Sequence, residues 1–92
     1  MIQSFKCAET QFLYEGRTVR GFVNRRAVAE RKLLMLDTAA SLSALRSAPG
    51  NRLEALQGHR AGQYSIRIND QWRACFIWTP DGPESVEIVD YH

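Results

Sequence analysis

Residues 63–78 read QYSIRINDQWRACFIW, and the fold prediction starts from this stretch. Two runs rich in β-branched and aromatic residues, QYSIRI and WRACFIW, flank the short segment NDQ, which is the pattern of a β-hairpin. A two-residue loop would place Arg67 among the aromatic residues. A loop over Asn69–Gln71 instead gathers one apolar face, formed by Tyr64, Ile66, Ile68, Trp72, Ala74, Phe76 and Trp78. Because burial of one face fixes the register of a hairpin, the odd-numbered loop is predicted.

The opposite face of this hairpin carries Ser65, Arg67, Arg73, Cys75 and Ile77. The predicted register sets Arg67 beside Arg73, and a guanidinium group matches phosphate oxygens in pairs. The two arginines are therefore a candidate phosphate site on a rigid sheet. Two solvated arginines on an exposed sheet face explain the same pattern, and the hairpin alone does not decide between these interpretations.

Helical periodicity precedes the hairpin. Residues 8–16 predict two turns of helix that end at Gly16, and residues 17–24 predict a linker. A longer helix is predicted from Asn24, a candidate N-cap, with an apolar stripe formed by Ala29, Leu33, Leu36 and Ala40. Residues 41–45 predict a further short helix.

Short strands complete the predicted fold. Residues 1–5 alternate apolar and polar and predict a strand, residues 51–56 predict another within an irregular connection, and residues 85–92 predict the last. The prediction is a single α+β domain over residues 1–92, with helices from the N-terminal half on one face of a mostly antiparallel sheet.

Composition narrows the class of protein. An apolar share of 45% is typical of globular proteins and argues against disorder. No apolar run approaches the ~20 residues of a membrane span, and the start MIQSFKCAET does not fit a signal peptide, so a cytoplasmic protein without a membrane partner is expected. Cys7 and Cys75 are then expected to be reduced thiols. Their spacing indicates no metal site, and no cofactor is expected.

Charge is unevenly distributed along the chain, although the net charge is only +2. Residues 17–32 carry six bases and one acid, residues 46–73 carry five arginines and two acids, and residues 81–92 carry four acids and neither lysine nor arginine. Ten of the twelve bases are arginine, which favours an RNA or DNA phosphate partner. Arginine in place of lysine on solvated faces explains the composition equally well.

The stretch VEIVDYH ends with Asp90, Tyr91 and His92, which are side chains that transfer protons. Cleavage of RNA without a metal needs a base for the ribose 2′-OH, an acid for the leaving 5′ oxygen, and cations for the charge on phosphorus. His92 can act as base or acid near neutral pH, Asp90 can orient it, and Tyr91 can stack on a nucleobase. A terminus without such a role is the alternative.

Strand alternation adds a constraint on this tail. It turns Asp90 and His92 to the core side and sends only Tyr91 toward the arginines. A site built from these residues therefore requires that the strand twists or ends near Asp90, or that the site wraps around the edge of the sheet.

Residues 49–78, PGNRLEALQGHRAGQYSIRINDQWRACFIW, followed by VEIVDYH, resemble the HigB family of toxins within the RelE/ParE superfamily. Phe5 and Cys7 near the start and the segment AERKLLMLDTA fit the family in the same order. The resemblance implies a RelE-like fold with a small curved sheet. It also implies a ribosome-dependent endonuclease that cuts mRNA without a metal, and a HigA-type helix-turn-helix antitoxin that represses the operon.

The resemblance implies roles for single residues. Asp90, Tyr91 and His92 match the catalytic end of the family, and Arg73 matches the arginine that holds the scissile phosphate. Arg60, in GHRAG, matches a loop arginine that is either RNA-facing or structural.

Two positions depart from the family pattern. Glu54 and Gln57 stand where some members carry histidine and lysine, which puts the cleavage rate, the cut-site preference and the proton donor in doubt. Glu54 is a candidate replacement acid–base group or an ordinary solvated carboxylate. Arg25 and Arg26, in the basic helical region, are expected to contact ribosomal RNA rather than the cut site.

Two other functions stay open at this point. A toxin that acts on DNA gyrase would need the basic surface but no acid–base set. An inactive module that co-represses operator DNA through the antitoxin is the second alternative. The acid, phenol and imidazole at positions 90–92 favour the nuclease.

Overall fold

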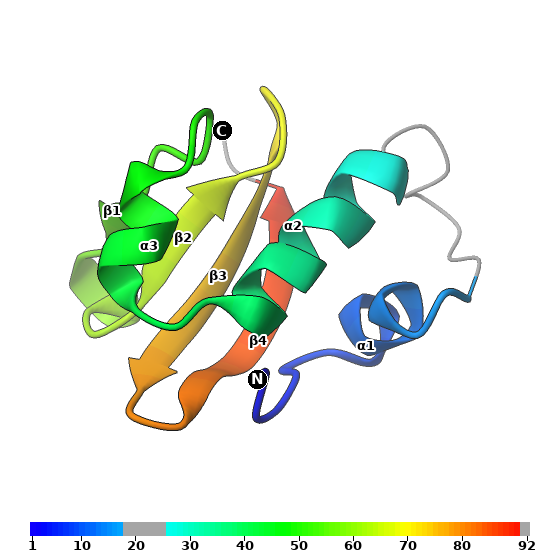
Figure 1. Cartoon of the computed structure of the whole chain (residues 1–92), viewed down its shortest axis with the longest axis horizontal. Helices are drawn as coiled ribbons and strands as arrows, with labels where there is room; N and C mark the ends of the chain where they lie inside the picture. The colour runs from blue at the N-terminus through cyan, green and yellow to red at the C-terminus, as the bar shows by residue number, and fades with distance from the viewer. Residues whose placement is uncertain (18–25, 91–92) are drawn as a thin grey trace.

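The computed structural model describes residues 1–17 and 26–90, shown in Figure 1. Within these ranges the chain forms three α-helices and a four-stranded antiparallel sheet in the order β1-β2-β3-β4. The elements are α1 (Ala8–Tyr14), α2 (Arg26–Thr38), α3 (Leu42–Ser47), β1 (Glu54–Ala55), the 3-10 helix η2 (Gly58–Arg60), β2 (Tyr64–Arg67), β3 (Trp72–Thr79) and β4 (Gly82–Asp90). The predicted α+β fold is confirmed.

The β2–β3 hairpin has the predicted register. Arg67 pairs with Arg73, and the backbone N–H of Ile68 donates to the carbonyl oxygen of Trp72 at 2.9 Å. The loop is therefore the odd-numbered segment Asn69–Gln71, as the apolar alternation predicted.

The core lies between one face of the sheet and the helices, and Figure 1 shows α2 and α3 lying over that face. Its buried side chains are Leu13, Ala29, Leu33, Leu36, Leu45, Ile66, Ile68, Ala74, Phe76, Val86 and Ile88. The predicted stripe of α2 is confirmed except at Ala40, which is exposed beyond the end of the helix. Burial of this apolar surface is the main stabilising contribution to the fold.

The predicted strand over residues 1–5 is wrong in extent. Only Phe5 forms a bridge, which is parallel and pairs with Val86 of β4. The pairing of β4 with β3 is irregular nearby, because the register shifts between Cys75 and Ile77 and Ser85 adopts a positive φ of 52°. A bulged strand offers a partner only a short regular ladder.

Two further predictions concern the segments beside the sheet. The strand predicted within residues 51–56 is confirmed as the short β1. The helix predicted over residues 8–16 is α1, which ends at Tyr14, and Gly16 just beyond it has a φ of 85°. Of the predicted linker at residues 17–24, only Arg17 is among the described residues. The candidate N-cap Asn24 lies outside them. No helix of the described chain has the length and apolar character that crossing a membrane requires.

Candidate phosphate-binding site

The face of the sheet opposite the helices, called here the open face, carries polar side chains on all four strands. Glu54, Ser65, Cys75 and Glu87 are successive cross-strand partners from β1 to β4. The neighbouring row consists of Arg67, Arg73 and Val89. The structure therefore brings Glu54, Arg67 and Arg73 onto one surface, as the strand parity predicted for the two arginines.

Arg73 is buried, with 7% of its surface exposed. Its Nε donates to the Oγ of Ser65 at 2.7 Å, and its Nη2 donates to the carbonyl oxygens of Arg52 at 2.6 Å and of Ser65 at 3.3 Å. The interpretation of two solvated arginines is wrong for Arg73, because the connection before β1 covers it. Several neutral acceptors hold its guanidinium in one orientation.

Arg67 is half-buried and has a different environment. Its Nη2 forms an ion pair with the carboxylate of Asp70, whose side chain is 99% exposed in the hairpin loop. Its backbone N–H donates to the carbonyl oxygen of Asn51 at 2.6 Å. The main chain of Arg67 is therefore fixed, whereas its guanidinium contacts a group that solvent surrounds.

Asp90 ends β4 beside this pair. It pairs with Trp72, and its Oδ2 accepts a hydrogen bond from the Nε2 of Gln71 at 3.1 Å. Val86 and Ile88 are buried in the core, as the alternation required, so Asp90 lies on the helix side at the end of the sheet. The carboxylate is exposed there and borders the hairpin loop. Tyr91 and His92 lie outside the described residues, and their catalytic roles stay predictions.

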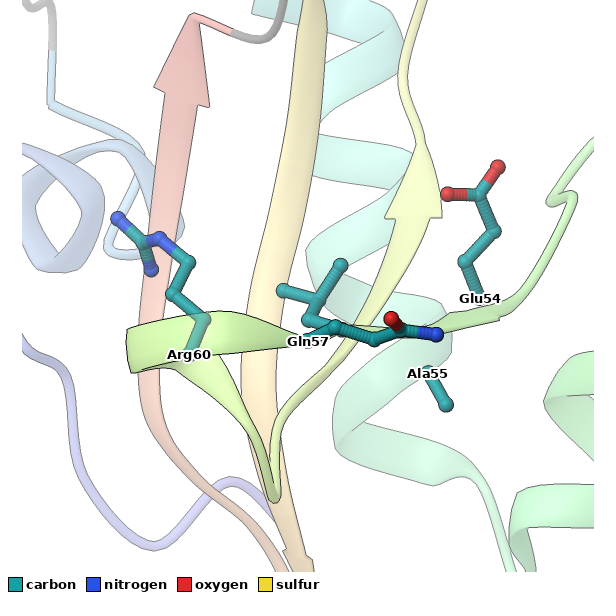
Figure 2. A pocket seen from close by; sticks show the side chains of 5 residues that line it. Glu54, Ala55, Gln57 and Arg60 are labelled. Carbon is teal, nitrogen blue, oxygen red and sulfur yellow. The ribbon is translucent and has the colours of Figure 1, made fainter.

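A hollow of about 360 Å³ lies on the open face and is lined by Glu54, Ala55, Leu56, Gln57 and Arg60. Figure 2 shows the side chains of Glu54 and Arg60 on opposite sides of it. Arg60 Nη1 donates to the Oε1 of Glu87 at 3.0 Å and to the Oε1 of Gln63 at 3.2 Å. Of its two predicted roles, these contacts favour the structural one, because they hold η2 against β4.

Cys75 lies at the centre of the open face and is fully buried. Burial raises the pKa of its thiol, and the carboxylate of Glu87 acts in the same direction. The charges of Arg60 and Arg73 act in the opposite direction but do not overcome the burial. The thiol is therefore neutral near neutral pH and packs as a small apolar group.

Arg26, predicted to contact ribosomal RNA, makes contacts within the chain. Its Nε donates to the Oε1 of Glu30 at 2.5 Å, and its Nη2 donates to the carbonyl oxygen of Gly16 at 2.6 Å. The first bond lies within α2, and the second holds the first turn of α2 against the segment that follows α1. Arg25 lies outside the described residues.

Lys32 ends the basic helical region, Arg25 to Lys32, that was predicted to contact ribosomal RNA, and its burial makes that prediction wrong for this residue. A role for it inside the protein was not predicted. Lys32 is 8% exposed, and its Nζ donates to the Oδ1 of Asn51 at 2.5 Å. Burial, followed by the charges of Arg31 and Arg67, lowers the pKa of this ammonium. Its spacing of three residues from Ala29 and four from Leu36 was a usable signal, because that spacing places it on the apolar face of α2.

Comparison with known proteins gives the family. A profile of the HigB-like toxin family, described as the RelE-like toxin of the type II toxin–antitoxin system HigB, matches residues 4–92. The chain is 47% identical over 62 residues to Toxin HigB-1 of Vibrio cholerae serotype O1, which covers 67% of this chain and 64% of that protein. It is 39% identical over 57 residues to an uncharacterized protein of Haemophilus influenzae, which covers 62% of this chain and 54% of that protein.

The matched stretch thus spans less than two thirds of the length of either relative. The family profile, by contrast, extends from residue 4 through the residues DYH at positions 90–92. This match is consistent with the α+β fold of the structure, and it confirms the resemblance to the HigB family that was drawn from the sequence. This chain belongs to the HigB-like family, the RelE-like toxins of type II toxin–antitoxin systems.

Proposed function

We propose that this chain is a cytoplasmic, ribosome-dependent mRNA endonuclease and the toxin of a type II toxin–antitoxin pair. The observation that carries the proposal is the position of Arg67 and Arg73. They are cross-strand partners on the open face, and the adjacent strand β4 ends beside them at Asp90, directly before Tyr91 and His92. We therefore assign the phosphate-binding cations and the proton-transfer groups to this one end of the sheet.

The proposed reaction is a transesterification within the RNA. The ribose 2′ oxygen attacks the adjacent phosphorus and the bond from phosphorus to the 5′ oxygen breaks, which leaves a 2′,3′-cyclic phosphate and a free 5′-OH. A base removes the 2′ proton and an acid protonates the 5′ oxygen. We assign one transfer to His92, with Asp90 orienting the imidazole, and Tyr91 to stacking or to the phosphate. Glu54, exposed on the open face, is the candidate for the second transfer.

Arg73 is assigned to the charge that develops on phosphorus. Its bonds to Ser65 and to the Arg52 carbonyl fix the guanidinium before substrate arrives. Donors fixed in this way cost no reorganisation in the transition state, which is why such groups contribute strongly to catalysis. The proposed chemistry uses acid, base and cations, so it requires no metal ion.

The proposed partners follow from the family and from charge. A type II toxin has an antitoxin, and we assign a HigA-type helix-turn-helix protein, through which this chain would reach operator DNA indirectly. The ribosome and its mRNA are the proposed target. Arg25 and Arg26 are assigned to ribosomal RNA and Arg60 to RNA near the cut, although the contacts of Arg26 and Arg60 within the chain reduce the charge that each offers.

Mapping of mRNA 5′ ends in a translating extract tests this function. New ends within translated codons are expected, while the same mRNA without ribosomes stays intact. Intact mRNA together with stalled DNA replication would instead indicate a toxin that acts on DNA gyrase. Intact mRNA, normal replication and operator binding only with the antitoxin would indicate a co-repressor module.

A further inference from the structure

A buried polar contact links α2 to the connection that precedes β1. The Nζ of Lys32 donates to the Oδ1 of Asn51, a residue that is fully buried. Within residues 1–17 and 26–90, no carboxylate lies within ion-pair distance of Lys32. An ammonium buried in this way is costly, because desolvation disfavours its charge.

Asn51 has one fixed orientation in this contact. Its Nδ2 donates to the carbonyl oxygen of Leu45 at 3.0 Å and approaches the Sδ of Met35 at 3.1 Å. A lysine only donates hydrogen bonds, so it must meet the oxygen of the Asn51 amide and never its nitrogen. Lys32 and the Leu45 carbonyl therefore hold the Asn51 amide from its two ends, and Lys32 supplies the only donor to its oxygen within the described residues.

The main chain of Asn51 and Arg52 connects this buried contact to the two arginines of the open face through two carbonyl oxygens. The Asn51 carbonyl oxygen accepts the N–H of Arg67 at 2.6 Å, and the Arg52 carbonyl oxygen accepts the Nη2 of Arg73 at 2.6 Å. Arg52 has a φ of 46°, a backbone region that residues other than glycine adopt only at a cost. Contacts on both sides must therefore hold this peptide in place.

We propose that Lys32 is a positioning residue for Arg73: by holding Asn51, it fixes the Arg52 carbonyl that orients the phosphate-binding guanidinium. The proposal rests on the proposed function of Arg73. It adds Lys32, which lies on α2 and does not itself contact Arg73, to the residues that determine cleavage. Displacement of a catalytic group by ~1 Å costs on the order of 100-fold in rate, so a small shift of Arg52 is sufficient for a large effect.

The direct test is hydrogen exchange of the Arg73 Nη2 protons, which donate to the Arg52 carbonyl, followed by NMR in the isolated protein. Lys32→Met is expected to raise this exchange rate by about tenfold or more, which corresponds to ~1.4 kcal/mol of lost protection. Arg31→Met is the matched control, because Arg31 is exposed on the same helix and loses the same charge. Unchanged exchange at Arg73 in folded Lys32→Met protein would overturn the proposal.

Lys32→Gln keeps the test decisive if Lys32→Met does not fold. Its amide is uncharged and lies one bond closer to the backbone than the lysine ammonium, so it holds the Asn51 oxygen less firmly and faster exchange at Arg73 is again expected. Lys32→Arg retains charge and donor and should restore slow exchange. Slow exchange in the Gln variant would reject the positioning role.

A kinetic cycle in a reconstituted translation system connects the contact to cleavage. At saturating concentrations of mRNA-programmed ribosomes, Lys32→Met should lower the rate on the order of 100-fold. In an Arg73→Lys background the same substitution should add little, since residues that act as a unit are not additive. If the losses in rate from the two substitutions multiplied fully, Lys32 would not act through Arg73. A wild-type chain that does not cleave would refute the proposed function, while the exchange measurement would still decide the role of Lys32.

Discussion

Arg67 and Arg73 are direct cross-strand partners, and their guanidinium groups turn to different surroundings. Arg73 donates to Ser65 and to the Arg52 carbonyl inside the protein, whereas Arg67 pairs with the exposed Asp70 at the hairpin loop. Like charges directly opposite each other destabilise a sheet, and this division of contacts reduces that cost. It also fixes the side chain of Arg73, whereas Arg67 can exchange its contact with Asp70 for one with a phosphate.

Asp70→Asn is expected to strengthen RNA binding. The Asp70 carboxylate pairs with the guanidinium group of Arg67, which a phosphate would also contact. An incoming phosphate must therefore displace the carboxylate. Exposed ion pairs are weak, and the gain should therefore be about two- to fivefold in the Kd of a single-stranded oligoribonucleotide. Fluorescence anisotropy at fixed salt measures the change.

Asp81→Asn is the matched control for this substitution. Asp81 is an exposed acid in the β3–β4 turn, so its loss changes the net charge equally without freeing Arg67. Equal tightening in both variants would mean that net charge, and not competition at Arg67, governs binding.

Arg73→Ala is expected to lower the free energy of unfolding by about 1–3 kcal/mol, because it leaves the buried acceptors of Ser65 and the Arg52 carbonyl without their donor. The protein should still fold, because this cost is a fraction of the stability of a typical domain. Urea unfolding measures the change. Arg67→Ala, at a half-buried position, should cost less. An Arg73→Ala protein as stable as wild type would refute the structural part of the role.

Loss of cleavage is a separate expectation for the same arginine. Removal of a donor to the charge on phosphorus costs on the order of 100-fold or more in rate. Arg73→Lys tests this more cleanly than alanine, because it retains a cation while losing the fork geometry. A folded Arg73→Lys protein that cleaves at the wild-type rate would remove the guanidinium from the mechanism.

Local pattern was sufficient to predict the hairpin and much of the core. Strict alternation around Asn69–Gln71 allows only one register that buries the aromatic face, and the stripe through Leu33 and Leu36 allows only one face of α2 to be buried. Strand parity likewise predicted that Asp90 would lie on the helix side of β4.

Contacts that depend on an irregular connection were not predictable in this way. Arg73 is buried because the carbonyl of Arg52, 21 residues earlier, reaches it, and Lys32 contacts Asn51, which is 19 residues away. The connection carrying Arg52 and Asn51 has no periodic pattern from which its path can be derived. The shortened pairing of residues 1–5 depends on the bulge of β4, which leaves no signal in the alternation of SVEIVD.

The pH dependence of stability should contain a contribution from Lys32. Its ammonium has a lowered pKa in the folded protein, because of burial first and then the charges of Arg31 and Arg67. Between that value and the ordinary 10.5, the unfolded chain binds more protons than the folded one. Stability therefore rises with pH in this window through Lys32.

Comparison with Lys32→Met isolates this contribution. The free energy of unfolding of the wild type minus that of the variant should increase as pH is raised from about 7 toward about 10, as measured by urea unfolding. Burial raises the pKa of Cys75 and Tyr14, which acts in the opposite direction above their ordinary values, but both groups are present in both proteins. A difference that is constant or falls with pH would contradict the prediction.

His92→Ala is expected to abolish most cleavage and to leave stability almost unchanged. Loss of a general acid or base costs about 10²- to 10⁴-fold in rate. The described core draws on β4 only as far as Ile88, so the free energy of unfolding should change by less than about 0.5 kcal/mol. Asp90→Asn should give an intermediate rate, because it keeps the shape of the side chain and removes the charge that orients the imidazole. Growth arrest and mRNA cleavage measure activity, with the melting temperature as the control for folding.

His59→Ala is the matched control, because His59 is the other imidazole of the chain and is exposed in η2. It should cleave at close to the wild-type rate if His92 carries the proton. If His92→Ala stays fully toxic and cuts mRNA normally, residues 90–92 are not the acid–base set. The transfers would then have to come from Glu54 and His59, and Glu54→Gln combined with His59→Ala would be the variant that loses activity.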